Sequence, residues 1–142
     1  MEDYGRNIIT IELDQLLSTA TEKKMTGWRL AQICSAYVDG RYELSYTFGK
    51  EYEVVHYRIV VDKETLVPSI TQIYDAAFLY ENEMKELFGV NMEHIAVDYK
   101  NKLYRIDEEA PFIQGTAQGK TGTTSGNVNK VNTVADNQKK EV

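Results

Sequence analysis

The feature that most constrains the fold is a series of three alternating runs between residues 28 and 61. Each run places apolar side chains at every second position on one face, which is the period of a strand with one buried side. In the middle run these positions hold Tyr42, Leu44, Tyr46 and Phe48. Asp39-Gly40 between the first two runs is a strong hairpin signal, and Gly49-Lys50 offers a second turn. The pattern predicts an antiparallel meander of three long strands.

The segments around this meander predict a further strand and two helices. A β-branched run at residues 8–11 is typical of a short strand. Residues 16–25 have helical periodicity, with Asp14 as the candidate N-cap and Gly27 at the end. A second amphipathic helix is expected at about residues 74–88, because its apolar positions recur at helical spacing. The order β-α-β-β-β-α predicts an α+β domain whose helices pack on one face of the sheet.

Composition divides the chain into two parts. Residues 1–113 hold nearly all the large apolar side chains and are expected to form one domain. Residues 114–142 are rich in Gly, Thr, Asn, Gln and Lys, so we expect a disordered tail. The net charge is −6 and the tail contributes +2, which leaves −8 on the folded part. An acidic domain of this kind argues against nucleic acid as a partner.

The inventory of metal-binding side chains is small. Cys34 is the only cysteine, so no disulfide or thiolate cage can form within the chain, and we expect it to be a small buried side chain. His56 and His94 are too far apart in the sequence for a local metal motif. No membrane-spanning run or signal peptide is visible. We therefore expect a cytoplasmic protein that carries no catalytic group and no cofactor, and that reaches a membrane only through partners.

The second helix carries a cluster of carboxylates at Glu81, Glu83 and Glu86. Glu83 and Glu86 are three positions apart and share a helix face, while Glu81 has the favourable spacing for an ion pair with Lys85. We expect Glu81 to be exposed beside Lys85 and the other two to face a partner. Alternatives are a solvated charged surface, or internal groups that pair with a side chain such as Arg58.

The frame Glu81-x-Glu83-x-x-Glu86-x-x-Gly89 resembles the E-R-E-x-x-D-x-x-G signature of the NuoC-like family, the thirty-kilodalton subunits of respiratory complex I. The resemblance covers about residues 7–113, but Asn82 replaces the family arginine and Glu86 the usual aspartate. After Gly89 the chain lacks the Gly-His-Pro and the arginine pair typical of complex I members. This ending is more similar to the corresponding subunits of membrane-bound, energy-converting [NiFe] hydrogenases.

The resemblance implies a structural role. The chain would be a docking subunit on the cytoplasmic arm of a ferredoxin-linked, ion-translocating hydrogenase, peripheral on the inner face of the membrane. It would pack against the large subunit, near an iron–sulfur small subunit, and these partners would carry the nickel–iron and iron–sulfur centres. The implied partner-binding residues are Glu81, Glu83, Glu86, Phe88 and Gly89.

Three other functions remain open from the sequence. One is the equivalent subunit of a complex I-type oxidoreductase that uses NADH or another donor with a quinone. A second is a stand-alone α+β adaptor that shares only the acidic helix. A third is a small hydrolase that uses Glu83 and Glu86 with a metal, because paired carboxylates can hold a cation or transfer protons.

Overall fold

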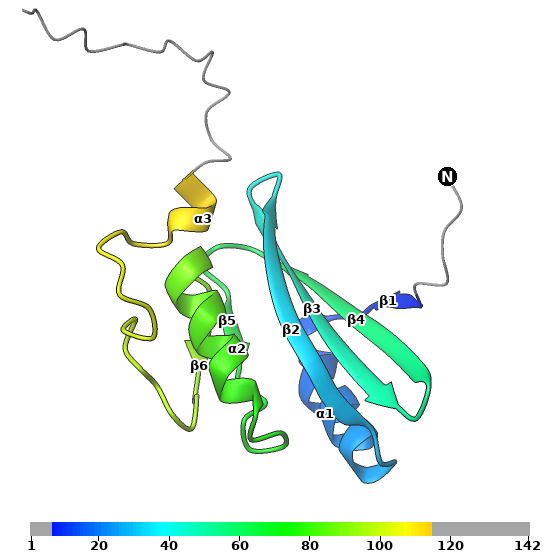
Figure 1. The fold of residues 1–142 in the computed structure, drawn as a ribbon. Coiled ribbons are helices and arrows are strands. Elements are labelled where there is room, and N and C mark those ends of the chain that lie inside the picture. The colour runs from blue at the N-terminus through cyan, green and yellow to red at the C-terminus, as the bar shows by residue number, and fades with distance from the viewer. Residues whose placement is uncertain (1–6, 115–142) are drawn as a thin grey trace, which may run out of the picture.

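The computed structural model describes residues 7–114 and confirms the α+β class (Figure 1). A short 3-10 helix, Leu13–Gln15, follows the first strand, and a π-helix, Met84–Phe88, directly continues α2. The strands and α-helices are β1 Ile8–Thr10, α1 Leu16–Met25, β2 Arg29–Val38, β3 Arg41–Lys50, β4 Glu53–Val61, β5 Leu66–Pro68, α2 Ala77–Glu83, β6 Asn91–Glu93 and α3 Pro111–Gln114.

The predicted meander is present as a four-stranded sheet in the order β1-β4-β3-β2. The pairs β2–β3 and β3–β4 are antiparallel, whereas β1 runs parallel to β4. Asp39 and Gly40 form the first turn with φ values of 50° and 78°. Positive φ at both central residues is the conformation that suits a two-residue hairpin between twisted strands.

The second predicted turn is wrong by two residues. Gly49 and Lys50 end β3, and the turn follows at residues 51–52, where Glu51 takes a φ of 52°. Gly49 instead lies under a side chain of the paired strand, because a Cβ at this position would lie 3.0 Å from the guanidinium of Arg29. Glycine thus marks a close approach between neighbouring strands here and not a turn.

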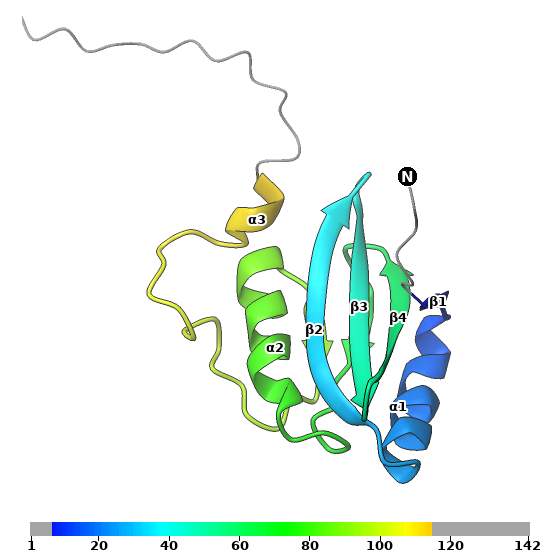
Figure 2. The same ribbon diagram turned by 45° about the vertical axis from the view of Figure 1, so that its right-hand side comes forward.

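One face of the sheet carries the core. Alternating residues of β3 are fully buried, and their cross-strand neighbours on β4 include Val55 and Ile59. The helices α1 and α2 add Leu16, Ala20 and Ala77 to the same cluster. Figure 2 shows α2 on the side of β2 and α1 on the side of β1 and β4. The expectation that helices pack on one sheet face is therefore confirmed.

The opposite face has the residues between these core positions. Cys34 is exposed there, so its expected burial is wrong. The strict alternation predicted for this run is wrong, because a bulge between Leu30 and Gln32 turns both Leu30 and Ile33 toward the core. Arg58 lies 3.9 Å from Glu43 on the neighbouring strand, where it cannot serve the carboxylates of the second helix.

The first helix has its expected bounds, Leu16–Met25, but its start is formed differently. A capping box between Glu12 and Gln15 starts the 3-10 helix, and the predicted cap at Asp14 is wrong. The second helix begins at Ala77, about three residues after the expected start. A parallel pair of short strands, β5 and β6, was not predicted. The predicted disordered tail, residues 114–142, lies outside the described residues except for the end of α3.

Candidate functional site

The helix with the carboxylate cluster lies between two irregular segments that precede and follow it. Residues 69–76 lead into α2, and residues 94–110 run back along it before α3 (Figure 1). The helix continues into the π-helix, which ends at Gly89. Polar side chains of the helix form hydrogen bonds with the backbone of both segments. The sequence around Glu81 therefore determines how these two segments pack against the helix.

Glu81 is completely buried, which contradicts its expected exposure beside Lys85. Its carboxylate accepts hydrogen bonds from the Ile70 amide at 2.8 Å and from the Ser69 hydroxyl at 2.5 Å. Burial raises the pKa of the Glu81 carboxyl, while these two hydrogen bonds act in the opposite direction. The Glu81 carboxylate therefore holds the segment before α2 by accepting hydrogen bonds from it, without a positively charged partner.

A chain of hydroxyl groups extends this contact to the segment after the helix. The single hydroxyl proton of Ser69 is donated to Glu81, so the 2.7 Å contact between Ser69 and Thr71 requires Thr71 as donor. Thr71 in turn accepts the amide of Ala96 at 3.0 Å. One buried carboxylate thus organises backbone groups on both sides of α2.

Glu86 is also buried and binds the segment that follows the helix. Its carboxylate accepts the amides of Leu103 at 2.8 Å and Tyr104 at 3.0 Å. These two amides lie in an irregular segment, where no strand or helix supplies an acceptor for them. The Glu86 carboxylate satisfies both donors. Glu86 is thus an internal ligand of its own chain, and the described residues include no basic side chain that pairs with it.

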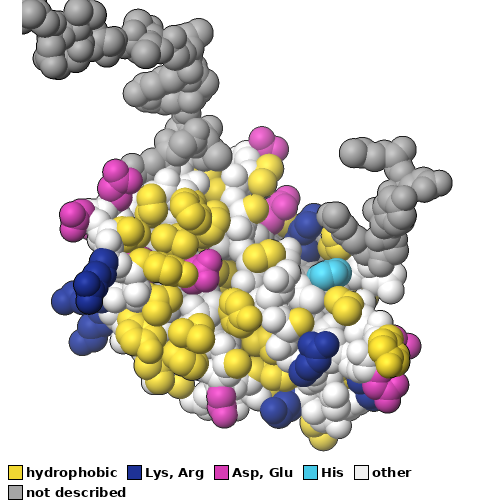
Figure 3. Space-filling model, in the orientation of Figure 1, with side chains coloured by type: hydrophobic (Ala, Val, Ile, Leu, Met, Phe, Trp, Pro, Cys, Tyr) yellow, Lys and Arg dark blue, Asp and Glu magenta, His cyan; other side chains and the backbone are white. Residues whose placement is uncertain are grey.

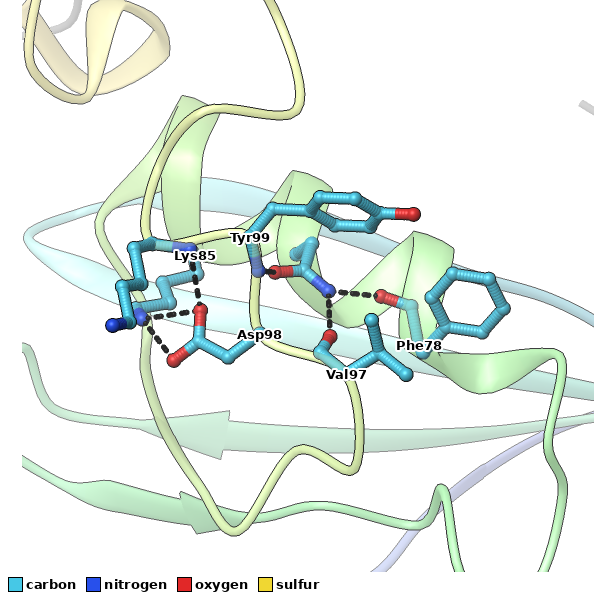
Figure 4. Close-up of polar contacts among 7 residues, drawn as sticks. Phe78, Lys85, Val97, Asp98 and Tyr99 are labelled. Carbon is cyan, nitrogen blue, oxygen red and sulfur yellow. Dashed lines mark hydrogen bonds and ion pairs between the residues drawn. The ribbon is translucent and has the colours of Figure 1, made fainter.

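Asn82, which stands where the family motif has arginine, is a further structural residue. Its side-chain amide donates to the carbonyls of Phe78 and Val97, both at 2.7 Å, and its oxygen accepts the Tyr99 amide at 2.9 Å. Figure 4 shows these contacts beside the ion pair of Lys85 with Asp98. An asparagine inside a helix is a signal for such side-chain contacts with backbone groups.

Lys85 pairs with Asp98 at 2.9 Å and not with Glu81, as the sequence spacing suggested. The hydrogen bond from Lys85 is the main cause that lowers the pKa of the Asp98 carboxyl, and the Lys100 amide adds to it. The pair lies at the surface, so it contributes little to stability. The ion pair instead fixes a position, because it holds residues 97–100 against the helix.

Phe88 and Gly89 close the helix through contacts within the chain. The Phe88 carbonyl accepts the Tyr42 hydroxyl at 2.6 Å, and its ring packs edge-on against Phe112 at a centroid distance of 5.2 Å. Gly89 has a φ of 73°, the left-handed conformation that often ends helices. A Cβ there would lie 3.2 Å from Ala110, so both the backbone conformation and the space at this position favour glycine.

Glu83 is the member of the cluster that stays partly exposed. It lies near Tyr104, and the charge of Glu83 is the first cause that raises the pKa of the Tyr104 phenol. The prediction that Glu83 and Glu86 share a helix face is confirmed, because both reach Tyr104. Their predicted roles in partner binding stay predictions, and Glu83 is the one placed where a partner can reach it.

Apolar side chains are exposed on α2 and on the segment that follows it. Leu79, Val97, Tyr99 and Tyr104 are all substantially exposed, and Phe78 packs against Tyr99 at a centroid distance of 6.3 Å. Figure 3 shows hydrophobic side chains gathered over α2 and the segment after it. We call this region the α2 surface; its residues are Phe78, Leu79, Val97, Tyr99 and Tyr104.

The carboxylates of the site are not arranged around a common point. Within residues 7–114, no group of three or more His, Cys, Asp or Glu side chains is arranged to hold a metal ion. The two buried carboxylates, Glu81 and Glu86, bind backbone groups on different segments and do not converge on a shared cleft. None of the helices in this part of the chain is long and apolar enough to cross a membrane.

Comparison with known proteins places this geometry in a family. A search of curated proteins finds no match. One similar solved structure is described as the membrane-bound sulfane sulfur reductase (MBS), an archaeal respiratory membrane complex. A chain of it shares 21% sequence identity, with a TM-score of 0.59, over 78% of this chain and 70% of that chain.

A family model matches residues 9–105 and thus includes most of β1, the helices α1 and α2 and the Glu81–Gly89 frame. The model is described as "Respiratory-chain NADH dehydrogenase, 30 Kd subunit". The match spans the sheet, the helix with its three carboxylates, and the segment that Glu86 binds. The chain therefore belongs to the family of the 30 kDa subunit of respiratory-chain NADH dehydrogenase.

Proposed function

We propose that this chain is a non-catalytic docking subunit on the cytoplasmic arm of a membrane-bound, ion-translocating oxidoreductase complex. Its partner is a subunit of the large-subunit type, which binds the α2 surface. The observation that carries the proposal is that the polar and the apolar side chains of α2 point in different directions. Glu81, Asn82 and Glu86 turn inward to fix the flanking segments, and apolar side chains are left outside with Glu83.

A surface of this kind suits a permanent partner. Aromatic and large aliphatic side chains are favoured in the cores of interfaces, and contiguous apolar patches on monomers commonly mark interaction sites. The inward hydrogen bonds hold this surface in one conformation before binding, which reduces the ordering cost of association. The family model and the respiratory complex that contains the similar chain supply the setting of a multi-subunit membrane assembly.

Within this class, we assign the chain to the branch of energy-converting [NiFe] hydrogenases that use ferredoxin. The support comes from the sequence after Gly89, which lacks the Gly-His-Pro and arginine pair of complex I members. The second candidate is the equivalent subunit of an NADH- or other donor:quinone oxidoreductase, which the description of the family model favours. In either case the metal centres belong to the partner subunits and the membrane is reached through them.

Purification from native membranes tests the proposal. The tagged full chain, isolated from detergent-solubilised membranes of its own organism, should bring down a multi-subunit complex that contains iron. Nickel in that complex, with paired CxxC motifs in its large subunit, supports the hydrogenase branch; iron without nickel supports the quinone branch. The chain expressed alone should contain neither metal. Recovery of the chain alone from the native membranes and cytosol would contradict a subunit role and favour an adaptor.

A further inference from the structure

A groove crosses the α2 surface beside Glu83. It has a volume of about 370 Å³ and lies between α2 and the segment that Glu86 holds. The lining residues are Ala76, Leu79, Tyr80, Glu83, Leu103 and Tyr104. Five of the six are apolar or aromatic, so Glu83 is the single charged side chain in the wall. We call this feature the Glu83 groove.

The groove is maintained by groups that are themselves fixed. Glu86 binds the amides of Leu103 and Tyr104 and so sets the far wall. The near wall is helical, and Tyr80 is tied to the sheet by a 3.2 Å hydrogen bond from its hydroxyl to the Ala31 carbonyl. Both walls are therefore positioned before any partner arrives, while Leu79 and Tyr104 remain 47% and 43% exposed.

The charge of Glu83 has no cationic partner in the described part of the chain. Arg41, Arg58 and Lys85 pair with Asp62, Glu43 and Asp98, respectively. Lys85, the nearest lysine along the helix, is one of the three cations already occupied. The contact of Glu83 is instead the phenol of Tyr104, whose pKa it raises. A carboxylate among apolar walls that becomes covered by a partner would be destabilised unless that partner supplies a positive charge.

We propose that the Glu83 groove receives an arginine side chain of the partner subunit, whose guanidinium pairs with the Glu83 carboxylate. This inference rests on the proposed function and specifies the chemistry of its interface. Arginine fits better than lysine for two reasons. Its planar guanidinium can form two parallel hydrogen bonds with a carboxylate, and it can stack on the rings of Tyr80 or Tyr104. Leu79 and Leu103 would cover its aliphatic stem.

The decisive comparison uses Glu83→Gln with Glu22→Gln as the matched control. Glu22 is an exposed carboxylate on α1, outside the groove. Each full-length variant is titrated onto the native complex from which the wild-type subunit has been removed. Glu83→Gln should weaken binding by roughly 30-fold or more, because the partner's cation is left buried and unpaired. Glu22→Gln should bind as the wild type does, and both variants should melt as the isolated wild-type chain does.

A second measurement identifies the partner residue. A photo-crosslinking amino acid at position 79 should capture one peptide of the large subunit, and that peptide should contain an arginine. Replacing this arginine by glutamine should cost as much as Glu83→Gln alone, and the double variant should cost little more, which shows direct coupling. Additive losses, a captured peptide with lysine and no arginine, or unchanged binding of Glu83→Gln would each overturn the proposal.

The two proposals fail in different ways. If Leu79→Asp abolishes binding while Glu83→Gln does not, the α2 surface is the docking site but the ion pair is wrong. The proposed function then stands without the arginine. If the wild-type chain joins no membrane complex at all, the proposed function fails first, and the arginine site falls with it.

Discussion

Three glutamates within six residues have three different environments. Glu81 and Glu86 are buried and accept backbone amides, whereas Glu83 stays at the surface beside Tyr104. The sequence shows only that carboxylates recur on a helix, and spacing alone suggested an exposed Glu81 paired with Lys85. It could not reveal that the segments before and after the helix present unpaired amides to it. The ligands of Glu81 and Glu86 are 33 or more residues apart, so no local pattern encodes them.

The buried Glu81 predicts a pH dependence of stability. Its pKa is raised by burial, whereas the unfolded value is about 4.3. Its stabilisation is therefore complete below about pH 4 and is lost as the pH rises through the folded pKa. Glu81→Gln cannot ionise, so its free energy of unfolding relative to the wild type should improve steadily above pH 4. Urea denaturation between pH 4 and 8 measures this difference; a constant difference, or one that moves the other way, would refute the raised pKa.

At the scale of elements, the sequence predicted those with a regular apolar period. It did not predict the short or irregular elements. The three long strands and the Asp39-Gly40 hairpin follow from period-two patterns and turn chemistry. The strands β5 and β6 have three residues each, too few for a pattern, and pair only because the chain returns after Gly89. The π-helix was also missed, because an i→i+5 turn leaves no distinct signal in apolar spacing.

The end of the π-helix offers a test of what Gly89 contributes. Gly89→Ala must adopt a positive φ and must also place its Cβ 3.2 Å from Ala110. Gly40→Ala is a matched control, since its φ is 78° but no atom lies within 4 Å of the new Cβ. The control should lose about 1–2 kcal/mol from backbone strain alone. Gly89→Ala should lose at least about 1 kcal/mol more from the contact, as measured by chemical denaturation. Equal losses would show that Ala110 simply moves away.

At the scale of the whole molecule, exposed apolar side chains gather on one side of the domain. The core occupies one face of the sheet, and α2 with the segment after it presents an apolar surface away from that core (Figures 1 and 3). The sequence motif lies on the helix that carries this surface, but none of the five residues that form the surface belongs to the motif. It did not show which of its residues face outward, because that depends on hydrogen bonds such as those of Asn82 to residues 97 and 99.

The central claim is that the α2 surface is covered by a partner in the assembled complex. Hydroxyl-radical footprinting of the full chain, isolated and within the native complex, tests it most directly. Oxidation of Leu79, Tyr99 and Tyr104 should fall severalfold on assembly. Met25, at the end of α1, and Tyr52, in the β3–β4 turn, are highly exposed internal references and should keep their reactivity. Equal oxidation of Leu79 and Tyr104 in both states would contradict the account.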